Sequence, residues 1–390
     1  SIISLSRVYA QTKPSIIRLN YGMQRHAGGG MAVRTLTCIP GITGDWRHAG
    51  GGVCYDTRGF FGMAWDALWR DDLRTAPART LLMTRLGEGL LELADPPVKA
   101  LFVYASNPAV SIPHQTKVLR GLAREDLFTV VVEHVHTDTT PYADLVLPAT
   151  MMHEHADLLI AYGHLYIAWN APAVAPPGEC LPTTELFRRL ARAMQLTEPA
   201  LYDSDEQMAR DVLASGHPSL TGITLEALQE RGSIRLSYPQ PFVPFAHGFP
   251  TASGKLELVS ERMAAAGLDP VAGYTPPNEN TRDDREHPVV LLAPANHRFL
   301  NSCFNEPGPP TLHIHPDDAS GIATGQRVRV SNWRGAFVAI AEINKRVRRG
   351  VVSCTKGHGG PGVNATVDER DSDMGGGAVY HDNRVKLTPL

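Results

Sequence analysis

Long apolar runs and an excess of charge of either sign are both missing from this 390-residue sequence. No stretch approaches the roughly 20 consecutive apolar residues that a membrane-spanning helix needs, so we expect no membrane span in this chain. Lys and Arg number 37 against 40 Asp and Glu, which gives a net charge of -3. This balance provides no electrostatic attraction for nucleic acid, which we exclude as a partner.

Cysteine is also scarce, and its five positions are scattered: Cys38, Cys54, Cys180, Cys303 and Cys354. No two of them have C-x-x-C spacing. An odd count at such distances argues against a disulfide framework and against a zinc or iron–sulfur site built from these cysteines. We expect reduced, structural cysteines, and reduced cysteines point to the cytoplasm as the compartment.

Sixteen histidines are the most obvious candidates for metal ligands. The closest pairs, His134 with His136 and His153 with His155, lack a further histidine or carboxylate at the usual ligand spacing. The motifs of serine hydrolases, kinases and zinc peptidases do not occur either. The sequence therefore predicts no protein-built metal site and assigns no catalytic residue.

The spacing of apolar residues predicts two or three domains, with an α/β organisation first. We place the domains at residues 1–95, 96–285 and 286–390. Helical spacing covers 2–11, 31–38 and 115–124, and strands are expected at 15–20, 98–104, 128–132 and 143–148. The strand at 98–104 is apolar throughout, as expected of a buried parallel strand. Ligands of such sheets bind at the carboxyl ends of strands, where Asn107 and the 133–137 loop fall.

The last third of the chain changes character. Short β runs separated by glycine turns predict a small β-barrel over 286–390. Before it, we expect helices near 205–214 and 225–231, an alternating strand at 251–258 and a polar linker over 278–287.

Two glycine-rich stretches remain ambiguous at this level. Residues 26–30 lie between a predicted strand and a predicted helix, an arrangement that presents backbone N–H groups to an anion. Their spacing matches neither a dinucleotide fingerprint nor a P-loop, so a flexible turn is the alternative. The polar tail 357–380 is either disordered or ordered by a polar ligand, and its composition favours disorder.

Four stretches, taken in order, resemble the later part of molybdopterin oxidoreductases of the dimethyl sulfoxide reductase superfamily. They are residues 20–45, 98–108, 133–149 and 296–328, the last continued by 362–366 and 375–377. The resemblance covers essentially the whole chain. It implies Rossmann-like α/β domains with parallel sheets, followed by a C-terminal double-psi-type β-barrel. It also implies a bis-molybdopterin guanine dinucleotide cofactor with molybdenum or tungsten, a small-molecule substrate and a possible electron-transfer subunit.

The resemblance also implies cofactor contacts for five residues of the α/β part. Gly22 and Gln24 match a cofactor-contact motif of the family. Glu133 falls where an acidic residue often accepts hydrogen bonds from guanine. Thr137 would hold ribose or phosphate, and Asn107 would lie near the same cofactor at the end of its strand.

Four residues of the barrel part complete the set implied by the resemblance. His297, Asn301 and Ser302 fall in the segment that reaches the phosphates or the pterin. Asn364 matches a residue that hydrogen-bonds the pterin ring. On this interpretation the tail 357–380 is ordered by the cofactor.

Two parts of the family pattern have no counterpart in this sequence. One is the N-terminal portion with its cysteine set for a [4Fe–4S] cluster, and the other is the segment that supplies a protein ligand to the metal. We therefore expect the cofactor-binding C-terminal part of an oxidoreductase, either truncated or paired with another polypeptide, that performs two-electron redox or oxygen-atom transfer. The alternative is a non-catalytic binding or assembly module that kept the fold and lost the metal site.

Overall fold

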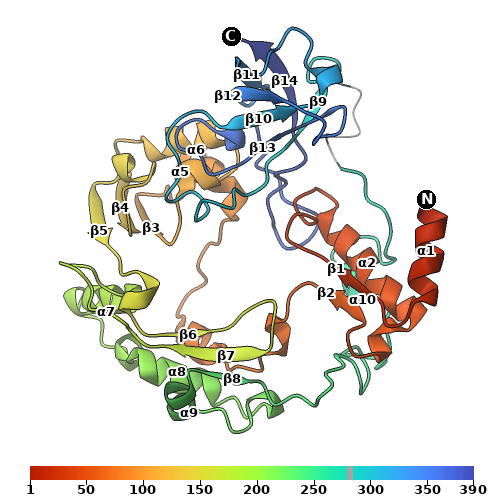
Figure 1. Ribbon diagram of the computed structural model, residues 1–390. Coiled ribbons are helices and arrows are strands. Elements are labelled where there is room, and N and C mark those ends of the chain that lie inside the picture. The colour runs from red at the N-terminus through yellow and green to blue at the C-terminus, as the bar shows by residue number, and fades with distance from the viewer. Residues whose placement is uncertain (278, 280–283) are drawn as a thin grey trace. The chain divides into compact units, whose positions relative to one another are not determined.

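The computed structural model describes residues 1–277, 279 and 284–390 (Figure 1). The chain forms two compact units, each assembled from three separate stretches. Unit 1 contains Ser1–Leu19, Thr37–Arg79 and Pro148–Leu256, and unit 2 contains Asn20–Leu36, Thr80–Leu147 and Glu257–Leu390. The predicted domain boundaries at residues 95 and 285 divide the chain into consecutive segments. This division stays a prediction.

Unit 1 combines two small sheets with helices. β1 (Ile16–Arg18) pairs in parallel with β2 (Gly52–Cys54), and β6 (Asp157–Leu159), β7 (Tyr166–Asn170) and β8 (Ser233–Arg235) form an antiparallel sheet. The helices include α1 (Ile2–Gln11), α3 (Asp66–Trp69), α7 (Thr183–Ala193), α8 (Asp205–Leu213) and α9 (Leu225–Arg231). The most completely buried side chains of its core come from β7, α9 and the residue after β8: Ile167, Leu225, Leu228 and Leu236.

The α/β part of unit 2 contains a three-stranded sheet of order β3-β4-β5. Its strands are β3 (Ala100–Tyr104), β4 (Phe128–Glu133) and β5 (Leu145–Pro148), and β3 and β4 run parallel. The helices α4 (Leu86–Leu91), α5 (Pro108–Ser111) and α6 (Gln115–Leu122) carry its core, where Leu90, Val118 and Leu122 are almost fully buried. The spacing of Val118 and Leu122 places both on one face of α6.

The strand predicted at 98–104 exists, but its predicted burial is wrong. Only Val103 of β3 is buried, whereas Phe102 and Tyr104 are 43% and 51% exposed. Side chains alternate between the two faces of a strand, so the helices cover one face of β3 and leave these aromatic side chains on the other.

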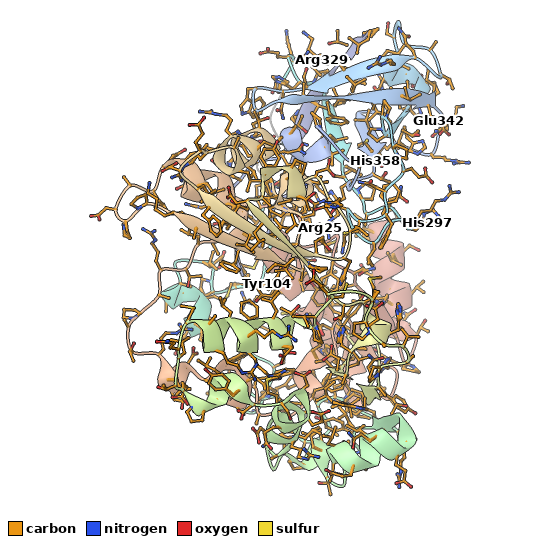
Figure 2. All side chains as sticks on the ribbon, turned by 90° about the vertical axis from the view of Figure 1, so that its left-hand side faces the viewer. Arg25, Tyr104, His297, Arg329, Glu342 and His358 are labelled. Carbon is orange, nitrogen blue, oxygen red and sulfur yellow. The ribbon has the colours of Figure 1, made fainter. Side chains whose placement is uncertain are left out.

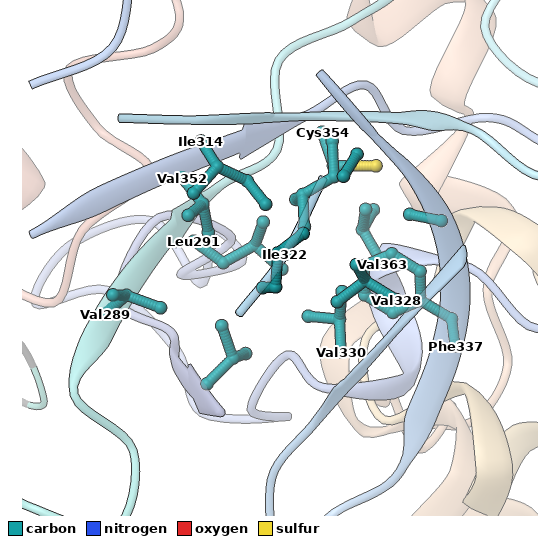
Figure 3. Close-up of a cluster of buried hydrophobic side chains, with 14 of the residues drawn as sticks. Val289, Leu291, Ile314, Ile322, Val328, Val330, Phe337, Val352, Cys354 and Val363 are labelled. Atoms are coloured by element: carbon teal, nitrogen blue, oxygen red, sulfur yellow. The ribbon is translucent and has the colours of Figure 1, made fainter. Parts of the chain in front are cut away.

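The C-terminal part of unit 2 is a closed β-barrel of order β10-β12-β11-β14-β9-β13, with β13 paired back to β10. The strands are β9 (Val289–Leu292), β10 (Thr311–Ile314), β11 (Arg327–Ser331), β12 (Ala336–Ile343), β13 (Val351–Cys354) and β14 (Arg384–Pro389). Alternate residues of β12, Phe337, Ala339 and Ala341, are buried in the barrel core (Figure 3). The predicted succession of parallel α/β sheets and a C-terminal barrel is confirmed.

One local prediction needs correction. No strand forms at residues 251–258, because this stretch closes on itself: Gly254 N donates to Thr251 O, and Thr251 Oγ1 donates to Lys255 O at 2.7 Å. Local side-chain bonds of this kind compete with strand pairing. The predicted linker 278–287 lies partly outside the described residues. The remaining helix of unit 2 in this region is α10 (Glu261–Ala265).

Helix α2 (Gly29–Thr43) begins at the glycine-rich stretch 26–30, and a carboxylate of the chain itself lies at its start. Asp373 Oδ1 accepts a hydrogen bond from Gly30 N at 2.8 Å, and its Oδ2 accepts one from Met31 N at 2.9 Å. These are two of the N–H groups that a helix start cannot satisfy internally. The backbone donors that the sequence offered to an external anion are therefore bound by Asp373.

The tail 357–380 is ordered by contacts with the rest of unit 2, so the composition-based expectation of disorder is wrong. Asp371 accepts a hydrogen bond from Thr84, Glu369 pairs with Lys117 at 2.8 Å, and Asp368 pairs with a buried arginine of the barrel. The acidic residues that make the tail polar are thus the residues that attach it.

Among the described helices, none combines the length and hydropathy needed to cross a bilayer.

We predict that Asp373→Ala destabilises the protein by about 1–2 kcal/mol, because two N–H groups at the start of α2 lose their acceptor. Asp373→Asn keeps one carbonyl acceptor and is expected to cost less. The free energy of unfolding in guanidinium chloride measures both effects. Unfolding of Asp373→Ala at the wild-type denaturant midpoint would contradict this role.

Candidate functional site

The carboxyl ends of β3 and β4 are neighbours, because Tyr104 pairs with Val132. Asn107 follows β3, is 4% exposed and begins α5. Its Oδ1 accepts a hydrogen bond from Thr139 Oγ1 at 2.6 Å, and Thr139 Oγ1 in turn accepts one from Ala109 N at 3.1 Å. The amide of Asn107 is thereby held in one orientation, with Nδ2 without a partner among the described residues.

Asn364 meets the same short helix from the tail of the chain. It is 2% exposed, lies in the single turn Val363–Ala365, and donates from Nδ2 to Val110 O at 2.6 Å. Its Oδ1 has no partner among the residues that the structure describes. Asn107 and Asn364, which are far apart in sequence, are thus brought together at the two ends of α5.

Gln115 is a residue that the sequence analysis missed. This fully buried side chain at the start of α6 donates from Nε2 to Ala109 O at 2.7 Å and to Gly360 O at 2.9 Å. Its Oε1 accepts a hydrogen bond from Gly362 N at 3.0 Å. No spacing rule singles out a lone glutamine, so only the fold shows that Gln115 positions the loop that leads to Asn364.

Four of the nine predicted site residues share one unusual property. Each has a buried side-chain polar atom that finds no partner among the described residues: Gln24 Oε1, Asn107 Nδ2, Thr137 Oγ1 and Asn364 Oδ1. Leaving such an atom unpaired costs about 1–3 kcal/mol, and folded proteins contain only a few of them. These donors and acceptors suit a polar ligand, so the residues present fit the cofactor implied by the family resemblance.

Glu133 and Ser302 are also buried, and both form hydrogen bonds with neighbouring residues of the chain. Glu133 lies at the end of β4, and its Oε1 accepts a hydrogen bond from His134 N at 2.8 Å. Burial, followed by the charge of Glu133, raises the pKa of the nearby Cys303 thiol. Glu133 therefore lies close to the barrel segment that carries Ser302, and a raised pKa keeps this thiol protonated.

The other three predicted residues, Gly22, His297 and Asn301, lie at the surface of unit 2 (Figure 2 labels His297). Asn301 adopts a left-handed backbone with φ of 56°. Its carbonyl oxygen lies so close to Gly357 that a Cβ at residue 357 would collide with it. The structure gives these three no side-chain hydrogen bond to the buried group around α5.

Metal ligands are a separate question. Within residues 1–277, 279 and 284–390, no group of three or more His, Cys, Asp or Glu side chains is arranged to hold a metal ion. None of the five cysteines, all of which lie within the described residues, forms a disulfide.

Comparison with known proteins agrees with this arrangement. A family model described as "Molybdopterin oxidoreductase" matches residues 6–193, and one described as "Molydopterin dinucleotide binding domain" matches residues 295–384, which include Asn364 and most of the barrel. The chain belongs to the molybdopterin oxidoreductases. One of its relatives is a dimethyl sulfoxide reductase, as the family resemblance implied.

Among its relatives, "Probable oxidoreductase YoaE" of Bacillus subtilis is 40% identical over 99% of this chain and 58% of that protein. Dimethyl sulfoxide reductase DmsA of Escherichia coli is 25% identical over 99% of this chain and 55% of that protein. The structure of acetylene hydratase from Pelobacter acetylenicus has a similar fold, with a TM-score of 0.67 and 23% identity over 80% of this chain and 47% of that one. The chain therefore spans about half the length of these proteins.

We predict that Gln115→Leu destabilises the protein by about 2–4 kcal/mol, because two buried carbonyl groups and one N–H group lose their partner. Gln207→Leu, on an exposed position of α8, is the matched control and should change stability by less than about 0.5 kcal/mol. Denaturant unfolding measures both variants. Equal stability of the two would show that Gln115 does not hold the loop.

Proposed function

We propose that this chain forms part of the protein shell around a bis-molybdopterin guanine dinucleotide cofactor with molybdenum or tungsten, in an oxidoreductase that acts on a small molecule. The observation that carries the proposal is the set of unpartnered buried polar atoms on Gln24, Asn107, Thr137 and Asn364. All four residues belong to unit 2, which also contains the dinucleotide-binding match.

The hydrogen-bonding character of these atoms indicates which part of the ligand each would hold. Gln24 Oε1 and Asn364 Oδ1 are acceptors and need N–H or O–H donors, which pterin and guanine rings provide. Asn107 Nδ2 is a donor and suits a phosphate or ring oxygen. Thr137 Oγ1 can donate or accept, as a ribose hydroxyl or a phosphate requires. Glu133 would accept from guanine N–H groups.

The start of α2 has a different role in this proposal. Because Asp373 already accepts from the N–H groups of Gly30 and Met31, these donors are not available to a phosphate group. Phosphate binding then falls to side chains of unit 2, and the glycines of residues 28–30 serve the close packing of the chain. A Cβ at Gly30, for example, would lie 2.7 Å from Cβ of Met374.

When bound, the cofactor would supply the metal at which two electrons or an oxygen atom are exchanged, while the protein tunes and orients it. The residues of this chain would bind the organic part, orient it and exclude water.

A [4Fe–4S] cluster and an electron-transfer subunit, if the complete system uses them, would come from polypeptide outside this chain. We place the protein in the cytoplasm, because none of its five cysteines forms a disulfide.

The first test is the composition of the natively purified protein. We predict molybdenum or tungsten by mass spectrometry and about two guanosine monophosphates per metal after mild acid hydrolysis. Glu133→Gln should weaken nucleotide retention about tenfold, because a hydrogen bond to a charged acceptor contributes about 1.5–3 kcal/mol. Glu230→Gln, at an exposed position of α9, is the matched control and should retain the wild-type content.

Two other outcomes of this measurement are informative. Nucleotide without metal would mean that the chain binds the organic part of the cofactor and that the metal is acquired or kept by other means. Neither nucleotide nor metal would contradict the proposal and favour the alternative, a binding or assembly module that kept the fold without the metal site.

A further inference from the structure

Two cations of unit 2 lie against the same aromatic ring. The guanidinium carbon of Arg25 is 5.5 Å from the centroid of the Tyr380 ring, and the Nζ of Lys356 is 5.2 Å from it. Tyr380 is 8% exposed, and its hydroxyl donates to Ser111 O at 2.8 Å, which fixes the ring. Each cation gains some attraction from the π-face, but an aromatic ring does not neutralise a positive charge.

Neither cation has a carboxylate partner among the described residues. The nearby acid, Asp382, is already engaged: its Oδ2 accepts from Ala27 N at 2.9 Å, and its Oδ1 lies 3.2 Å from His26 Nδ1. We call Arg25, Lys356 and the Tyr380 ring the basic cluster.

The surroundings of the basic cluster respond to its excess of positive charge. His381 lies near the cluster and near His26, with its ring centroid 5.6 Å from that of His26. Burial, followed by the charges of His26, Arg25 and Lys356, lowers the pKa of His381 to about 4. Burial, followed by the charge of Arg25, lowers the pKa of Lys356 to about 8. Like charges held together in a half-buried place raise the energy of the ligand-free protein.

The backbone holds the basic cluster in place. Lys356 follows β13, and its N–H donates to Pro294 O at 2.9 Å. The carbonyl of Arg25 accepts a hydrogen bond from His381 N at 3.0 Å. Arg25, which Figure 2 labels, directly follows Gln24 in the sequence. The buried Oε1 of Gln24 has no partner among the described residues. The two cations are therefore positioned by the same loops that carry the candidate site.

We propose that Arg25 and Lys356 form a subsite for an oxyanion, with the Tyr380 ring as its apolar floor. An ordered oxyanion would offset the repulsion between the two cations and accept charge-assisted hydrogen bonds from both. A phosphate, sulfate-like or carboxylate group has the required chemistry. Two sources can supply it: a phosphate of the bound dinucleotide cofactor or an anionic small-molecule substrate. The choice between these sources rests on the proposed function, whereas anion binding itself does not.

Thermal unfolding in inorganic pyrophosphate, and separately in sulfate, tests the subsite when compared with chloride at equal ionic strength. The variants are Lys356→Gln and Arg25→Gln, with Lys356→Arg as the variant that keeps the charge. Arg329→Gln, which removes an exposed cation from β11, is the matched control. The guanosine monophosphate content of each purified variant is measured in parallel.

The two sources predict different results. If an anionic substrate occupies the subsite, pyrophosphate or sulfate raises the melting temperature of the wild type and of Arg329→Gln. Lys356→Gln and Arg25→Gln then bind the anion at least about tenfold more weakly, with unchanged nucleotide content. If a cofactor phosphate occupies it, Lys356→Gln and Arg25→Gln lose nucleotide, whereas Lys356→Arg and Arg329→Gln retain it.

In the protein without anion, Lys356→Gln should also melt at or above the wild-type temperature, because it removes a repulsion. If Lys356→Gln and Arg25→Gln change neither the response to the anion nor the nucleotide content, the inference is overturned. Nucleotide missing from every variant and from the wild type would count against the proposed function alone, since the anion titration still decides whether the subsite exists.

Discussion

The carboxylate of Asp373 at the start of α2 is the interaction on which the arrangement of unit 2 depends. It satisfies the N–H groups of Gly30 and Met31 and joins residues that are more than 340 positions apart in the sequence. Asp382 adds a second contact between the same two stretches, at Ala27. The loop that carries Gln24 is thus fixed on its helix side by the C-terminal tail, and its side chains have defined directions before any ligand is bound.

The polar groups of unit 2 divide into two kinds, and the division separates structure from function. Asp368, Asp371 and Asp373 each have donors within unit 2, and these bonds attach the tail. The buried amides of Asn107 and Asn364 each use one end for the fold and leave the other end without a partner among the described residues. An amide that is held at one end presents its remaining atom in a fixed direction, which is what recognition of a rigid heterocycle requires.

How much the sequence reveals differs from element to element for physical reasons. β9, β10 and β13 are among the short β runs that predict the barrel over 286–390, because each contains β-branched residues and is bounded by turn residues. β14 was missed although Arg384–Pro389 alternates polar with apolar residues, because it contains a proline and its pairing depends on β11 and β9. The family resemblance supplied the nine candidate contacts, whereas Gln115 and the α2 carboxylate arise only from tertiary structure.

The basic cluster shows why composition says little about a local field. A chain with net charge of -3 gives no sign that two cations will meet at one ring, since Arg25, Lys356 and Tyr380 come from three distant stretches. The fold that brings them together leaves the nearby carboxylate, Asp382, engaged at Ala27 and near His26. Asp382 is bonded to Ala27 N and lies beside His26, and no described carboxylate forms an ion pair with Arg25 or Lys356. The contacts of the C-terminal stretch therefore place two cations beside Gln24 without a paired acid.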